Sequence, residues 1–166
     1  VPARTAAFGL QSARDSGQAR RVLDVIRLHE LGHAVAAAYL HPAGFEGDPP
    51  VRWFDELVAS YLGHAYMRES RPELADFAET LAADEFRRGA PHFTSLEAYE
   101  RHYDGYIAAP QGGSTLGWYQ NVFNLRAAEL YDEHGLGFFR ALRKGLPWMR
   151  YELWTTDGTE TILQLV

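Results

Sequence analysis

The stretch SGQARRVLDVIRLHELGHAVAAAYL, residues 16–40, decides how this chain folds. Apolar residues and two histidines recur in it at steps of three and four, namely Val22, Val25, Ile26, His29, His33, Ala36 and Ala37. This spacing predicts a helix, and the many Ala, Leu and Arg residues favour one. The sequence His41-Pro42, with Gly44 after it, predicts that the helix ends at Leu40.

The rest of the chain also has a mainly helical pattern. Further helices are predicted over residues 51–69, 72–88, 95–103, 118–133 and 138–144. Pro72 suits a first helical turn and Ser95 an N-cap, whereas Gly135 ends a helix. Residues 108–117 are rich in Gly and are expected to be flexible. Strand signals are limited to residues 5–10 and to a tail after Pro147 that is either β-prone or frayed.

The fold class expected from this pattern is mainly α (α+β) with little β-sheet. No internal repeat and no boundary is visible, so residues 1–166 are expected to form a single domain. The apolar share of 46% and charged share of 23% are ordinary for a soluble globular protein.

Charge and hydropathy exclude several classes of protein. The net charge is −6 and no basic stripe is present, so no nucleic-acid partner is expected. No apolar run approaches the roughly 20 residues of a membrane-spanning helix. The absence of cysteine removes disulfides, thiolate metal ligands and a cysteine nucleophile. The chain begins at Val1 without a signal-peptide pattern, as a mature form or an excerpt would, and a secreted or periplasmic location is favoured over a cytoplasmic one.

The motif HELGH, residues 29–33, carries chemistry within the first helix. Residues four apart share a helix face, so His29 and His33 can bind one metal ion. Glu30 lies about 100° round the helix, where its carboxylate can hold and deprotonate a water molecule. Zinc lowers the pKa of such a water towards ~7, so one Zn2+ ion is the expected cofactor, with iron, cobalt or manganese as alternatives that suit the same kinds of ligand. The alternative is a pair of histidines on a helix face, satisfied by hydrogen bonds.

A catalytic zinc needs a third protein ligand and one open position. Ala36 and Tyr39 stand where the metzincin extension requires glycine and histidine, which excludes that branch. The stretch WFDELVASY, residues 53–61, resembles the W-x-N-E-G-x-A-x-Y stretch of gluzincin metallopeptidases, as in their aminopeptidase branch. The resemblance implies a zincin-like metallopeptidase domain with Glu56 as the third metal ligand. Asp55 departs from the family's asparagine, and the segment between His33 and Glu56 is longer than in that branch.

The same family stabilises the oxyanion of the reaction with a tyrosine from a Y-x-K-G stretch that begins a later helix. The sequence WYQNV, residues 118–122, occupies a similar place, so the resemblance assigns this role to Tyr119. The Lys-Gly pair is absent, and Tyr103, Tyr106 and His102 are alternatives. The G-x-M-E-N stretch that grips a substrate amino terminus has no counterpart, so aminopeptidase activity does not follow.

Three residues near Glu56 are further candidates. Asp55 and Ser60 are expected to orient a metal-binding histidine through a hydrogen bond. His64 lies two helical turns, roughly 12 Å, beyond Glu56 and is a rival ligand, expected instead beside the site or facing solvent.

The function expected from these residues is that of a zinc-dependent metallopeptidase acting on a peptide or protein substrate. Glu30 is the expected general base, and zinc and Tyr119 are expected to share the oxyanion charge. The alternatives are a zinc-binding or interaction domain that has lost catalysis, and a regulatory intracellular protease with a short H-E-x-x-H domain.

Overall fold

The computed structural model describes residues 16–40, 52–88, 95–108 and 112–149, and these residues are nearly all helical. The helices are α2 (Ser16–Leu40), α3 (Arg52–Ser70), α4 (Pro72–Arg87), α5 (Leu96–Ala108), α6 (Gly112–His134) and α7 (Gly137–Met149). No strand occurs within these ranges, which confirms the mainly α class. The strand expected at residues 5–10 and the tail after Pro147 that was expected to be β-prone or frayed lie outside the described residues, apart from residues 148–149 at the end of α7.

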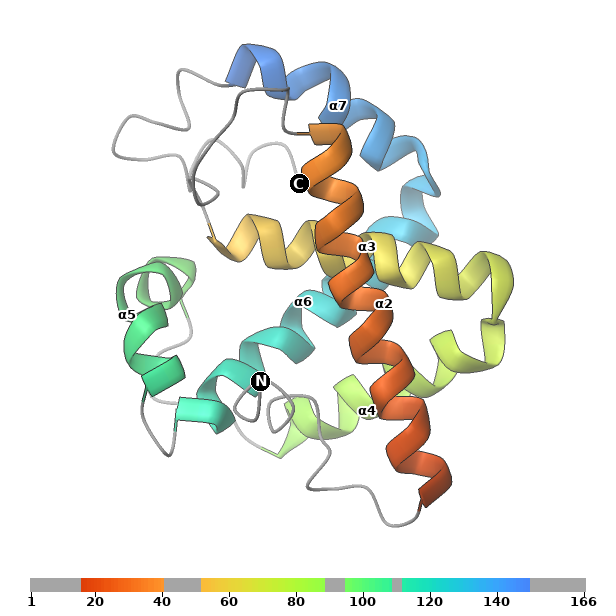
Figure 1. Cartoon of the computed structure of the whole chain (residues 1–166), viewed down its shortest axis with the longest axis vertical. Helices are drawn as coiled ribbons and strands as arrows, with labels where there is room; N and C mark the ends of the chain where they lie inside the picture. Colours follow the sequence, from red (N-terminus) through yellow and green to blue (C-terminus); the bar gives the residue numbers. More distant parts are fainter. Residues whose placement is uncertain (1–15, 41–51, 89–94, 109–111, 150–166) are drawn as a thin grey trace.

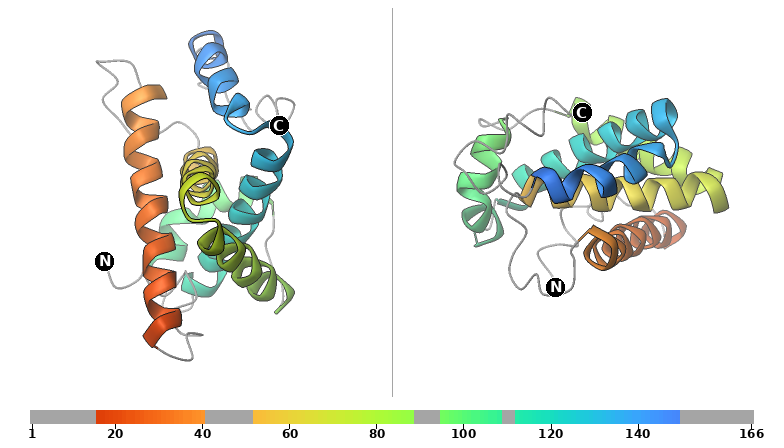
Figure 2. Two further views of the ribbon diagram at one scale, coloured as in Figure 1. Left: turned by 90° about the vertical axis from the view of Figure 1, so that its right-hand side faces the viewer. Right: turned by 90° about the horizontal axis from the view of Figure 1, so that it is seen from above.

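Helix α3 lies at the centre of the molecule. Helix α2 crosses it on one side and α6 lies on the other, as two perpendicular views show (Figure 1, Figure 2). All six residues from Glu56 to Tyr61 are buried, so α3 has no solvent face over this stretch. A helix that is buried all round has no amphipathic pattern, and its polar residues therefore need partners inside the protein.

Aromatic side chains fill the larger part of the core. Trp53, Tyr61, Tyr99 and Tyr119 are among the largest fully buried side chains, and they join α3 to α5 and α6. Phe138 brings α7 onto the same cluster, with its ring 4.9 Å from that of Tyr61. Smaller apolar clusters connect α2 with α3 and α4. Packing from both sides therefore fixes α3 in place.

Most predicted helix ends are confirmed by local contacts. Pro72 begins α4, and the hydroxyl of Ser95 accepts a hydrogen bond of 3.1 Å from the backbone of Ala98 as an N-cap. Gly135 has φ of 50° after the last residue of α6, a conformation that favours glycine. None of the described helices has the combination of length and apolar character needed to cross a membrane.

Three helix limits differ from the prediction. Helix α5 continues to Ala108, α6 begins at Gly112 rather than near Trp118, and α7 continues to Met149. Leu116 is buried in the core, and this packing outweighs the low helix propensity of the neighbouring glycines. Helix α7 passes through Pro147, which removes one backbone hydrogen bond without preventing the helix from continuing for another two residues.

Candidate metal centre

The site lies where α2 crosses α3, and glycine makes the crossing close. A Cβ atom added to Gly32 would lie 2.9 Å from the Cα atom of Ala59 and nearer still to its carbonyl oxygen. At Gly63, an added Cβ would lie 3.1 Å from the carbonyl oxygen of Leu28. The two backbones are thus nearly in contact. This brings the HELGH face of α2 directly against the middle of α3.

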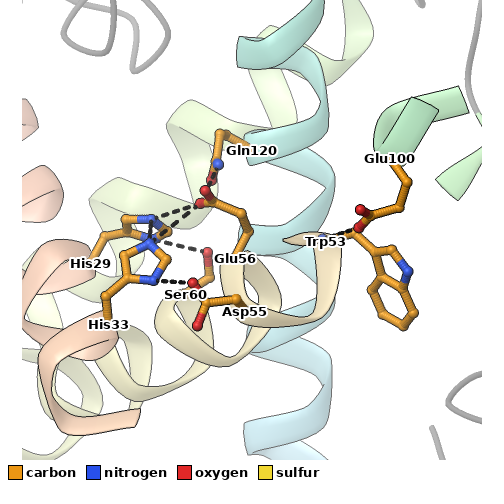
Figure 3. A network of polar contacts seen from close by, with 8 residues as sticks. All are labelled: His29, His33, Trp53, Asp55, Glu56, Ser60, Glu100 and Gln120. Carbon is orange, nitrogen blue, oxygen red and sulfur yellow. Dashed lines mark hydrogen bonds and ion pairs between the residues drawn. The ribbon is translucent and has the colours of Figure 1, made fainter. Parts of the chain in front are cut away.

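Three side chains converge at this crossing (Figure 3). The Nε2 atoms of His29 and His33 are 3.0 Å apart. The Oε2 atom of Glu56 lies 3.0 Å from the first of these nitrogens and 3.6 Å from the second. A tetrahedral zinc ion with bonds of about 2.0–2.2 Å places its ligand atoms about 3.3–3.6 Å apart, so this triangle is close to the size that such an ion requires.

Hydrogen bonds alone cannot account for the close contacts among these three atoms. If only one imidazole carries hydrogen on Nε2, one of the two contacts of 3.0 Å is left without a hydrogen; if both do, two N–H groups face each other. A cation at the centre would meet a lone pair from each of the three atoms at once. The donor set and its spacing therefore fit a divalent metal ion.

The outer side of each histidine ring is held by α3. Ser60 Oγ lies 3.2 Å from Nδ1 of His29, and Asp55 Oδ2 lies 2.8 Å from Nδ1 of His33. Asp55 and Ser60 thus contact the histidines that they were predicted to orient, while their role toward a bound metal ion stays a prediction. The carboxylate of Asp55 can only accept, so it fixes the tautomer of His33 that leaves Nε2 available as a metal ligand. The hydroxyl of Ser60 can accept from or donate to Nδ1 of His29, so it holds the ring in place without fixing its tautomer.

The electrostatics of the cluster are those of a largely buried ion pair. Burial opposes a charge on His33, but its hydrogen bonds with Asp55 and Glu56 prevail and raise its pKa to about 10. Burial also opposes ionisation of Glu56, yet hydrogen bonds from His29 and His33 hold the pKa of Glu56 well below its usual range. The metal-free cluster thus holds a carboxylate and a proton, and binding of a metal ion would displace that proton.

Helix α6 also reaches the site, through Gln120. Its Nε2 atom donates a hydrogen bond of 2.5 Å to Oε2 of Glu56, and both side chains are buried. Gln120 is not among the site residues predicted from the sequence. The sequence hints at a role for Gln120 only through the polar Gln-Asn pair, residues 120–121, in a helix whose neighbouring positions are largely apolar.

The two expected catalytic residues lie in different surroundings. Glu30 is exposed on α2, one residue after His29. Tyr119 is 1% exposed, and its hydroxyl donates a hydrogen bond of 2.9 Å to the carbonyl oxygen of Ser95. Its ring packs against those of Tyr99 and Phe123. The structure thus places Tyr119 in the aromatic core, whereas its neighbour Gln120 contacts Glu56.

The alternatives to Tyr119 are on α5. His102 is exposed, and the ring of Tyr103 is 4.8 Å from the guanidinium carbon of Arg52. The side chain of Tyr106 is outside the described part of the structure.

His64 does not join the cluster of His29, His33 and Glu56. It is 4% exposed, and its Nε2 atom is 3.5 Å from Oε1 of Glu79 on α4. The expectation that it packs beside the site rather than completing it agrees with this position. Burial and the nearby charge of Arg68 lower the pKa of His64 to about 4.

Comparison of the chain with models of protein families, with curated proteins and with solved structures gives no match. The residues and geometry of the site itself are therefore what indicates a function.

Proposed function

We propose that this chain is a zinc-dependent hydrolase of peptide bonds. The observation that carries the proposal is the convergence of two Nε2 atoms and one carboxylate oxygen, with both Nδ1 atoms held by other side chains. The general base expected from the H-E-x-x-H motif, Glu30, follows directly after the first ligand. Together with the α2–α3 helix pair, these features support a zincin-like arrangement.

The chemistry divides between the ion and the chain. Zinc bound by His29, His33 and Glu56 would supply Lewis acidity, lowering the pKa of water and polarising a carbonyl group. Glu30 would accept a proton from the attacking water and donate it to the leaving nitrogen. Asp55 and Ser60 would hold the imidazoles in place throughout, so that the ligands need little reorganisation during the reaction.

One observation favours a second candidate, a metal-binding domain without hydrolytic activity. The hydroxyl expected to stabilise the oxyanion, that of Tyr119, is bonded to the backbone of Ser95 in the core. A site without such a donor would bind a metal ion and yet hydrolyse peptides slowly, because one donor to the oxyanion contributes about 10²–10³-fold to the rate.

Metal content and hydrolysis distinguish these functions. The native chain would be compared with Glu30→Gln and, as a matched control, with Glu129→Gln, which changes an exposed glutamate paired with Arg126 on α6. We expect about one equivalent of zinc in all three proteins and a loss of casein and peptide hydrolysis of about 10²–10⁴-fold in Glu30→Gln alone. Zinc without hydrolysis in any protein would favour the second candidate, and absence of bound metal would refute both.

A further inference from the structure

Gln120 is an uncharged residue of α6 whose side chain is buried next to a carboxylate. Its side chain is 4% exposed, and it reaches Glu56 from the opposite side to the two histidines (Figure 3). The contact of 2.5 Å joins the amide nitrogen to Oε2, the same carboxylate oxygen that faces both imidazoles. Reversing the amide would set two acceptor oxygens against each other, so the N–H group is the one that meets the carboxylate.

The oxygen atom of the Gln120 amide indicates that this side chain is not buried here in order to stabilise the core. Oε1 of Gln120 is buried and has no hydrogen-bond partner among the described residues. A buried acceptor left unsatisfied costs about 1–3 kcal/mol, and an apolar side chain of the same size would avoid that cost. Its neighbours along α6, Leu116 and Phe123, are apolar and contribute to the core. A half-satisfied glutamine among them therefore requires another reason.

We propose that Gln120 is a positioning residue of the metal centre, acting through Glu56. Its N–H group occupies one lone pair of Oε2 and fixes the rotation of the carboxylate, so that the remaining lone pair of the same atom faces the histidines. Each of the three metal ligands is thus held by a separate side chain, with Ser60 and Asp55 on the histidines and Gln120 on the glutamate. This inference rests on the proposed metal site, but it does not depend on hydrolysis.

The test is the affinity for zinc, measured by competition with a chromophoric chelator. Gln120→Met keeps the length of the side chain and removes the donor. We expect its affinity to fall by about 10–100-fold, the usual effect of losing a group that orients a ligand. The control is Tyr119→Phe, which removes the neighbouring hydroxyl but keeps its ring, and it should change the affinity less than twofold.

Two further measurements separate positioning from a general effect on packing. The visible spectrum of the cobalt-substituted protein should change in Gln120→Met and not in Tyr119→Phe, because it reports the ligand geometry. In a Glu56→Gln background, Gln120→Met should cause no additional loss of affinity, because its effect passes through the carboxylate.

The outcomes are distinct from those that test the proposed function. If the native chain binds zinc and Gln120→Met binds it equally with an unchanged cobalt spectrum, the inference fails while the metal site stands. If metal-free Gln120→Met does not fold, the main role of Gln120 is structural and the inference fails again. A native chain that binds no zinc would overturn the metal site and the inference together.

Discussion

At the scale of single residues, the two histidines of the site differ in how they are held. His33 has a carboxylate, Asp55, on its outer nitrogen, whereas His29 has the neutral hydroxyl of Ser60. Hydrogen bonds to an ionised group are roughly twice as strong as those between neutral groups. The two partners should therefore contribute unequally to metal binding.

We predict that Asp55→Ala weakens zinc binding by about 10–100-fold, whereas Ser60→Ala weakens it by less than that. Loss of the carboxylate removes the contact that orients His33. It also removes the negative charge that makes the imidazole a better electron-pair donor to a metal ion. Competition with a chelator at pH 7 measures both affinities. Equal losses in the two variants would show that the charge of Asp55 is unimportant.

His64 makes stability depend on pH. Its pKa is about 4 in the folded protein against 6.5 for the free side chain, so the fold favours the neutral imidazole. This difference amounts to about 3 kcal/mol of stability, fully present above pH 6.5 and lost as the pH falls through that value towards 4. The physical cause is burial, with Arg68 adding repulsion.

We therefore predict that His64→Gln is less sensitive to acid than the native chain. The free energy of unfolding by urea, measured on metal-free protein at pH 7.5, 5 and 4, should fall more steeply in the native chain. The difference between the two proteins isolates His64, because both retain His33. Parallel curves would contradict the prediction.

At the scale of secondary-structure elements, the α2–α3 crossing decides whether His29, His33 and Glu56 meet. We predict that Gly32→Ala lowers stability by about 1–3 kcal/mol and weakens zinc binding, because its Cβ atom would overlap the backbone of Ala59 and push the helices apart. Gly105→Ala on α5 is the control, since its Cβ would meet nothing within 4 Å. That change should raise stability by about 0.5–1 kcal/mol through helix propensity. Urea unfolding and chelator competition measure both effects.

The sequence predicted helices and their ends well where local chemistry sets them. Pro72, the Ser95 cap and Gly135 each act through one turn of backbone, so their effects can be read from neighbouring residues. The predicted start of α6 was wrong because the packing of Leu116 in the core decides where this helix begins. Such packing cannot be read from the neighbouring residues in the sequence.

The candidate site also has a part that the sequence predicts and a part that it does not. Residues four apart on one helix predicted the pairing of His29 with His33, and the family resemblance pointed to Glu56 on the next helix; the structure brings all three together. Gln120 was missed because 64 positions separate it from Glu56 in the sequence. Which face of α6 meets α3 depends on the packing of the whole core, and the resemblance drew attention to Tyr119 instead.

At the scale of the whole molecule, the cluster of His29, His33 and Glu56 joins the consecutive helices α2 and α3, and Gln120 links it to α6, much further along the chain. Histidines from α2, a carboxylate from α3 and an amide from α6 meet in the interior. A metal ion that binds only this folded arrangement must stabilise it, since the unfolded chain offers no comparable site.

We predict that removing metal with EDTA lowers the melting temperature. Zinc at 100 times its dissociation constant contributes about 2.7 kcal/mol, which corresponds to about 5–10 °C for a chain of this size. Differential scanning calorimetry, with and without EDTA, measures the shift. The variant His33→Gln loses a ligand and should melt at the same temperature in both conditions; a shift in this variant would mean that EDTA acts elsewhere.

The burial of α3 has a consequence for how the sequence can change. Every position from Glu56 to Tyr61 is enclosed, so substitutions there have few acceptable side chains. Helix α2 has an outward face, with Glu30, Leu31 and Tyr39 exposed. In a library of single substitutions selected for folded protein, tolerance should therefore alternate with the helical period along α2 and stay uniformly low along the middle of α3. Among related chains, substitutions should likewise be frequent on the outward face of α2 and rare along the middle of α3.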